Sequence, residues 1–132
     1  MIRESITQTI RERGVKQVDM CRDLKLEVAN VNAFLHGKRT LPFQDLCLVM
    51  RYLGVSFGMR NRNETNWPPA AVHKLASAII SGRGIKTSDL AKMSGISASS
   101  VSSFITGERP LSLNNLETMC RFLNIGITKY TK

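Results

Sequence analysis

Serine hydroxyls crowd one side of a short predicted helix in the second half of the chain. The stretch 99–110 reads SSVSSFITGERP, and Val101, Phe104 and Ile105 are spaced like one apolar helix face. Serine is a mediocre helix former, and a merely solvated face would more cheaply carry Glu, Lys and Ala. Short hydroxyls can both donate and accept hydrogen bonds. The pattern therefore predicts a helix with one apolar and one hydroxyl-bearing face, and raises the question of what the hydroxyls serve. The serines on that face are Ser99, Ser100, Ser102 and Ser103.

The sequence that must position this helix is present twice. The segment from Arg13 aligns without a gap on the segment from Arg83, an offset of 70 residues. Such self-similarity indicates one small module used twice. We therefore predict a first module at residues 1–55, a linker at 56–70 and a second module at 71–132. The identities include Gly14/Gly84, Asp19/Asp89, Val31/Val101, Phe34/Phe104, Gly37/Gly107, Arg39/Arg109, Leu46/Leu116 and Leu53/Leu123.

Hydrophobic periodicity predicts four or five helices in each module and no sheet, hence an all-α fold. In the first module the second helix is expected at 17–24 and the third at 28–35. Val18, Cys21 and Leu24 are expected to face inward. In the second module the expected helix caps are Thr87 or Ser88, Ser97, and Ser112. The linker is rich in Asn, Arg, Gly and Pro, and Trp67 is expected to anchor it on one module.

The second and third helices of the second module form a recognisable motif, TSDLAKMSGISASSVSSFITGERP. Ala91 is small where two helices cross closely, and Gly95 stands where the turn requires a positive φ. Ile96 and Val101 hold the two helices together. This stretch resembles the helix-turn-helix of the phage repressor and Cro family, the xenobiotic-response-type regulators. The resemblance covers about 50 residues in each copy and implies two tandem lambda-repressor-like modules.

The resemblance implies that helix three of each module enters the DNA major groove. This answers why so many hydroxyls share one face. The base-reading residues it implies are Ala98, Ser99, Ser102 and Ser103 in the second copy, and Val28, Ala29, Asn32 and Ala33 in the first. The backbone-contacting residues it implies are Gln17, Asn30, His36, Lys38 and Arg39 in the first copy, and Lys86, Thr87, Ser97, Ser100, Thr106 and Arg109 in the second.

The first copy departs from the family pattern at two positions. Lys25 replaces the turn glycine, which implies backbone strain because a left-handed conformation disfavours a Cβ. Glu27 replaces the usual Ser or Thr at the cap of helix three, and it sets a carboxylate near where a phosphate would lie. We therefore expect the second copy to be the better base reader, and the first to contact chiefly the DNA backbone or another protein.

The charge balance favours a polyanionic partner. The 132 residues include 19 Lys and Arg against 10 Asp and Glu, for a net charge of +9. Both predicted modules are net positive, so the charge is not confined to a tail. The three cysteines lack close pairing and are expected to be buried thiols in a reducing cytoplasm. No membrane span or signal peptide is evident.

The inventory of reactive residues predicts no enzyme, no cofactor and no metal site. His36 and His73 have no partners at metal-ligand spacing, and no glycine-rich phosphate loop or catalytic set is evident. The expected function is a sequence-specific double-stranded DNA-binding transcriptional regulator, a repressor of phage or bacterial type. It would act as a pseudo-dimer within one chain or as a homodimer. The alternative is a protein-interaction module such as an antitoxin or antirepressor.

Overall fold

In the residues that the structure describes, four α-helices followed by one short strand occur twice, in the same order. The computed structural model describes residues 1–59 and 68–129. Each element of residues 72–129 has the bounds of its counterpart in residues 2–59, offset by 70. The elements of the N-terminal half are α1 (Ile2–Arg13), α2 (Gln17–Leu24), α3 (Val28–Leu35), α4 (Phe43–Leu53) and β1 (Val55–Met59). After a 3₁₀ turn, η1 (Pro69–Ala71), the C-terminal half contains α5 (Val72–Arg83), α6 (Thr87–Ser94), α7 (Ala98–Ile105), α8 (Leu113–Leu123) and β2 (Ile125–Lys129).

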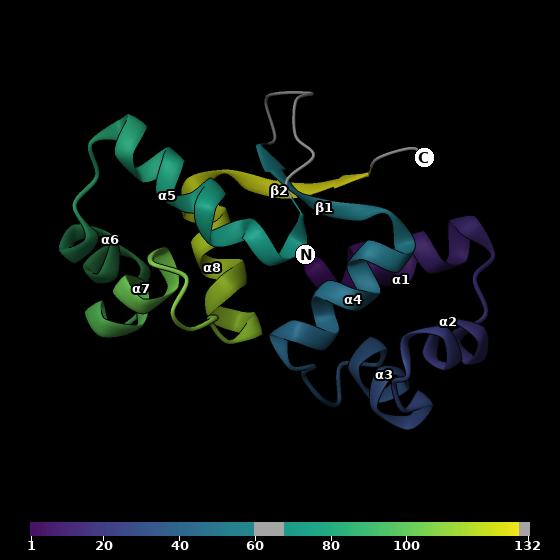
Figure 1. Cartoon of the computed structure of the whole chain (residues 1–132). Helices are drawn as coiled ribbons and strands as arrows, with labels where there is room; N and C mark the ends of the chain where they lie inside the picture. Colours follow the sequence, from purple (N-terminus) through teal and green to yellow (C-terminus); the bar gives the residue numbers. More distant parts are fainter. Residues whose placement is uncertain (60–67, 130–132) are drawn as a thin grey trace.

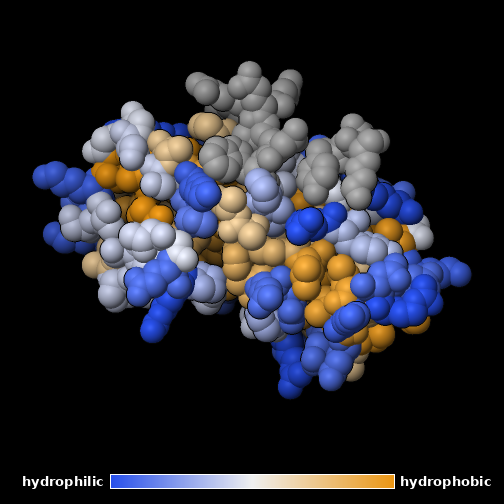
Figure 2. Space-filling model, in the orientation of Figure 1, coloured by the Kyte–Doolittle hydropathy of each residue, from blue (hydrophilic) through white to orange (hydrophobic). Residues whose placement is uncertain are grey.

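The two halves lie side by side, with the two strands running across both of them (Figure 1). Helices α2 and α3 lie at one end of the molecule, and α6 and α7 lie at the other. Helices α4 and α8 occupy the middle. Figure 2 shows hydrophilic residues in blue at the lower tips of the molecule, moderately hydrophobic residues in tan where the halves meet, and more strongly hydrophobic residues in orange on either side of them.

The fold is mostly helical, as expected, but the expectation of no sheet is wrong, because β1 and β2 form a two-stranded antiparallel sheet. Val55 pairs with Lys129, Phe57 with Ile127, and Met59 with Ile125. Phe57 and Ile127 are equivalent under the 70-residue offset, so each strand pairs with its own counterpart around this central pair. Two-fold dimers form contacts of the same kind between identical surfaces. Each strand has only five residues and its partner is 70 residues away, so hydrophobic periodicity gave no signal for it.

The predicted linker at 56–70 is too long at both ends. Residues 56–59 belong to β1, and Pro69 and Ala70 belong to η1. The proposed anchor Trp67 lies outside the described residues, as do all positions from 60 to 67.

The core is built mostly at positions that are buried in both halves, although the residues at many of these positions differ. Val31 and Val101 are buried, as are Phe34 and Phe104. One inward residue was misassigned: Val18 is 62% exposed, and Met20 is buried instead. Helix α2 thus faces the core with Met20 and Cys21, and not with Val18.

The three cysteines are free thiols and buried, as expected. Burial raises the pKa of the Cys47 thiol to about 12 and also raises the pKa of Cys21. These thiols are therefore protonated at neutral pH and are poor nucleophiles.

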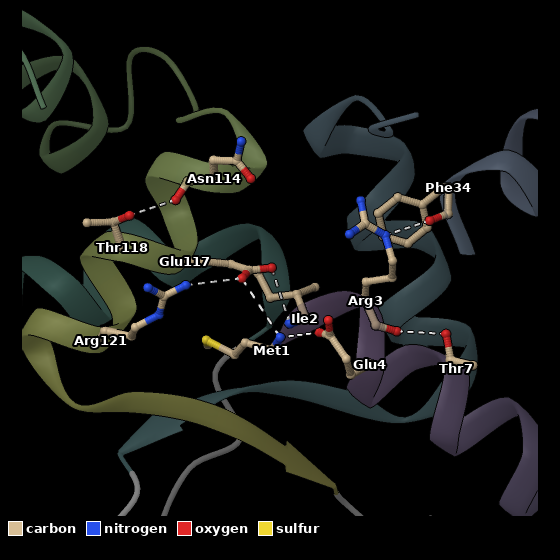
Figure 3. A network of polar contacts seen from close by, with 10 residues as sticks. All are labelled: Met1, Ile2, Arg3, Glu4, Thr7, Phe34, Asn114, Glu117, Thr118 and Arg121. Atoms are coloured by element: carbon tan, nitrogen blue, oxygen red, sulfur yellow. Dashed lines mark hydrogen bonds and ion pairs between the residues drawn. The ribbon is translucent and has the colours of Figure 1, made fainter. Parts of the chain in front are cut away.

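Polar contacts also join the halves. The Glu117 carboxylate on α8 accepts a hydrogen bond from the backbone N–H of Ile2, 3.4 Å, and lies 3.7 Å from the Arg121 guanidinium (Figure 3). This bond satisfies one of the free N–H groups at the start of α1. Lys129 of β2 pairs with Glu12 of α1, and this hydrogen bond lowers the pKa of Glu12. The sheet and these contacts together connect the N-terminal half to the C-terminal half.

Candidate nucleic-acid interface

In each half, two eight-residue helices are joined by a tight turn with one left-handed residue. Lys25 holds this position between α2 and α3 with φ 59°, and Gly95 holds it between α6 and α7 with φ 75°. The N–H of Leu26 donates to the Cys21 carbonyl at 2.9 Å, and the N–H of Gly95 donates to the Ala91 carbonyl at 3.0 Å. The strain expected at Lys25 is thus present, because a residue with a Cβ occupies the left-handed region.

Replacing Lys25 by glycine should raise the free energy of unfolding by about 0.5–1 kcal/mol, because glycine adopts this conformation without a Cβ clash. Urea denaturation of the full chain measures the change. The matched control is Gly95→Lys, which should lower the free energy of unfolding by a similar amount. A Cβ at Gly95 meets no atom within 4 Å, so the cost comes from the left-handed backbone conformation and not from a clash with a neighbour. A Lys25→Gly variant less stable than the unmodified chain would contradict the claim that the backbone is strained at Lys25.

The outer face of α7 is polar and open, while its inner face is buried. Val101 and Phe104 are 0% and 2% exposed and fix the helix to the core. Thus the predicted orientation of α7 is confirmed. Of the residues that the sequence assigns to base reading here, Ala98, Ser99 and Ser102 are exposed and Ser103 is partly buried.

Two of the expected serine caps are confirmed. Ser97 Oγ accepts a hydrogen bond from the N–H of Ser100 at 3.3 Å, and Ser112 Oγ accepts from the N–H of Asn115 at 3.3 Å. The cap expected at Thr87 or Ser88 is wrong, because α6 begins one residue earlier and its N-cap is Lys86, without a side-chain bond. Helices α7 and α8 therefore each begin with a serine cap.

A hollow of about 420 Å³ lies between α7 and the start of α8. Three of its lining residues are serines of α7, and a guanidinium is the only formally charged group among its lining residues. The hollow offers hydroxyls and one positive charge beside the apolar Pro110 and Leu111, and these polar groups suit an anionic partner. The polar lining residues are Ser99, Ser100, Ser103, Arg109, Ser112 and Asn115.

The corresponding face of α3 offers fewer hydrogen-bonding groups. Val28 is 41% exposed. Ala29 and Asn32 are exposed, and Ala33 is partly buried. Glu27 is the N-cap of α3 but makes no capping bond, as its replacement of serine predicts. The N-terminal half thus presents a less polar helix than the C-terminal half.

Several residues expected to contact the DNA backbone are bonded within the protein. His36 Nδ1 lies 2.8 Å from the Asn32 carbonyl, and the Thr106 hydroxyl donates to the Ser102 and Ser103 carbonyls at 3.1 Å each. These equivalent residues therefore close the last turns of α3 and α7. The other expected backbone residues are exposed at Lys38, Arg39, Lys86, Ser97, Ser100 and Arg109, and partly buried at Gln17, Asn30 and Thr87.

Sequence reasoning missed the residues of α1 and α5 that hold these helices in place. Arg3 Nε donates to the Phe34 carbonyl at 2.7 Å, and its guanidinium lies 5.2 Å from the centre of the Phe34 ring (Figure 3). The equivalent residue, His73, lies against Gly107, where an added Cβ would be 2.7 Å from its ring. Because Arg3 and His73 differ, the repeat gave no signal for either contact.

The residues that the structure describes contain no group of three or more His, Cys, Asp or Glu side chains placed to hold a metal ion. The longest helices among them, α1 and α5, have 12 residues each, too few to cross a bilayer.

No curated protein and no solved structure matched the chain. Residues 77–128 match the family model of the Cro/C1-type HTH DNA-binding domain. This segment runs from α5 through α6, α7 and α8 into β2. The segment that carries the serine-rich helix is thus similar to the Cro/C1-type helix-turn-helix domains, which bind DNA.

Proposed function

We propose that the chain is a sequence-specific double-stranded DNA-binding transcriptional regulator that represses by occluding a promoter. The observation that carries this proposal is the exposed, hydroxyl-bearing face of α7 within the segment that matches a DNA-binding family. Serines on that face can donate to or accept from base edges in the major groove. Arg109 lines the hollow beside it, and Lys86 is exposed at the N-cap of α6, so both can contact phosphates. A location in the cytoplasm of a bacterium, for a chain of phage or bacterial origin, fits this role.

Both halves would act together as a pseudo-dimer within one chain. The N-terminal half has the same element order, and its strand pairs with the equivalent strand of the C-terminal half. We propose that α3 and α7 enter successive stretches of major groove and that the operator has unequal half-sites, because the outer faces of the two helices differ. The α7 half would read bases through Ala98, Ser99, Ser102 and Ser103, and the α3 half would contribute fewer base contacts. A homodimer of this chain would present four such helices on a longer site.

One observation favours a second candidate function for the N-terminal half. The outer face of α3 exposes Val28 and Ala29. An apolar helix face of this kind can pack against another protein, as an antitoxin or antirepressor would require. In that case the N-terminal half would bind a protein partner.

Selection of duplexes from a random pool, followed by a salt titration, tests the proposal. We expect enrichment of one site with two unequal halves. Affinity for that site should fall steeply with salt, with a logarithmic slope of about −4 or steeper if five or more phosphates are contacted. A chain that binds no duplex at any salt concentration would contradict DNA binding and leave the protein-interaction alternative.

A further inference from the structure

Three side chains at the start of α3 form a continuous hydrogen-bonded row. Arg39 Nη1 donates to Asn30 Oδ1 at 2.9 Å. Asn30 Nδ2 in turn donates to Glu27 Oε2 at 3.2 Å. Both ends of the Asn30 amide are therefore engaged within the protein, and the Arg39 guanidinium is held beside the first turn of α3.

The equivalent residues of the C-terminal half are arranged differently. They are Ser97, Ser100 and Arg109. The Ser97 hydroxyl donates to Ser100 Oγ at 2.7 Å, so these two side chains bond each other. In the part of the chain that the structure describes, the Arg109 side chain makes no hydrogen bond or ion pair. Among the described residues, Arg39 is thus held by a side chain of α3, and Arg109 has no such contact with α7.

Holding an arginine side chain in one orientation favours binding of an anion. A free arginine loses much rotamer freedom when it binds, and a side chain that is already ordered avoids that loss. The single bond to Asn30 occupies one of the five guanidinium N–H donors, so others remain for a phosphate. Glu27 also polarises the Asn30 amide, which strengthens Oδ1 as an acceptor.

We propose that Asn30, fixed by Glu27, is a positioning residue that orients Arg39 to bind a DNA phosphate. This inference rests on the proposed function and gives Asn30 a role other than direct contact with DNA. It also explains why a carboxylate stands at the N-cap of a helix that faces a polyanion. The α3 half would thus offset its poor base-reading face with one preorganised backbone contact.

A double-mutant cycle on the full chain tests the proposal with the selected duplex. Arg39→Ala should weaken binding about tenfold or more and make the salt slope shallower by about 1. Asn30→Ala should weaken binding about fivefold while leaving the salt slope unchanged, because the arginine charge remains. In the Arg39→Ala background, Asn30→Ala should change the affinity less than about twofold, since its only effect on binding is through Arg39.

The control is the equivalent cycle of Ser100→Ala and Arg109→Ala, whose effects should add because Ser100 does not hold Arg109. Thermal unfolding curves for all variants separate loss of binding from loss of fold. If Asn30→Ala and Arg39→Ala are additive while the unmodified chain binds its duplex, this inference is wrong and the proposed function stands. If the unmodified chain selects no duplex, both are wrong.

Discussion

Replacing Ser99 and Ser102 together by glutamate should weaken duplex binding at least about 100-fold. Both hydroxyls are exposed on the outer face of α7. Glutamate would remove a donor at each position and place two carboxylates opposite base edges and phosphates, where like-charge contacts cost several kcal/mol. Fluorescence anisotropy at one fixed salt concentration, with the selected duplex, measures the loss.

The N-terminal half supplies a matched control at the same two helix positions. Ala29 and Asn32 are the equivalents of Ser99 and Ser102 and are likewise exposed. Replacing both by glutamate adds the same charge, so the comparison isolates the role of each helix. We expect a loss of about tenfold here, because Glu27 already places a carboxylate beside α3 and fewer base contacts are at stake. Thermal unfolding should be nearly unchanged in both variants, since all four positions are on the surface.

Two outcomes would change this view of the site. Equal losses in the two double variants would mean that α3 and α7 share the base reading. No loss in the α7 variant would mean that its serine face does not meet DNA, and the hydroxyls would then have another partner.

Local sequence signals were sufficient to predict the helices and the orientation of α7. The spacing of Val101 and Phe104 identified the buried face, and serine chemistry identified two caps correctly. The strained turn at Lys25 was predictable because its counterpart is Gly95. The buried face and the caps depend on interactions within a few residues, so a single repeat contains the information that specifies them. The strain at Lys25 was predictable only by comparing the two repeats.

The sheet and the contacts between the halves could not be predicted in the same way. A five-residue strand shows too little alternation, and β1 is stabilised by pairing with a strand 70 residues away. Arg3 and Glu117 act across 31 and 115 residues, on Phe34 and Ile2 respectively. The bond from Arg39 to Asn30 joins a loop to a helix, and the repeat could not reveal it because the other half has serine there.

The sheet is nevertheless where the two halves depend on each other most, and the second large effect is expected there. Phe57→Ala should lower the free energy of unfolding by about 3–5 kcal/mol, because Phe57 is fully buried at the centre of the paired strands. Urea denaturation of the full chain measures this loss. The affinity for a duplex with both half-sites should fall as well, since loosened halves no longer hold α3 and α7 at a fixed separation.

A variant of the residue that pairs with Phe57 tests whether the loss of affinity comes from the sheet or from a general loss of core packing. Ile127 is its equivalent and lies directly opposite, but it is only partly buried. Ile127→Ala should therefore cost less, about 1–2 kcal/mol, because fewer contacts and less apolar area are lost. The duplex affinity of each variant should be compared for the full site and for the α7 half-site alone. If Phe57→Ala weakens both duplexes equally, the sheet does not set the spacing of the two helices. A loss confined to the full site would be the expected result, because only that duplex requires α3 and α7 to bind at once.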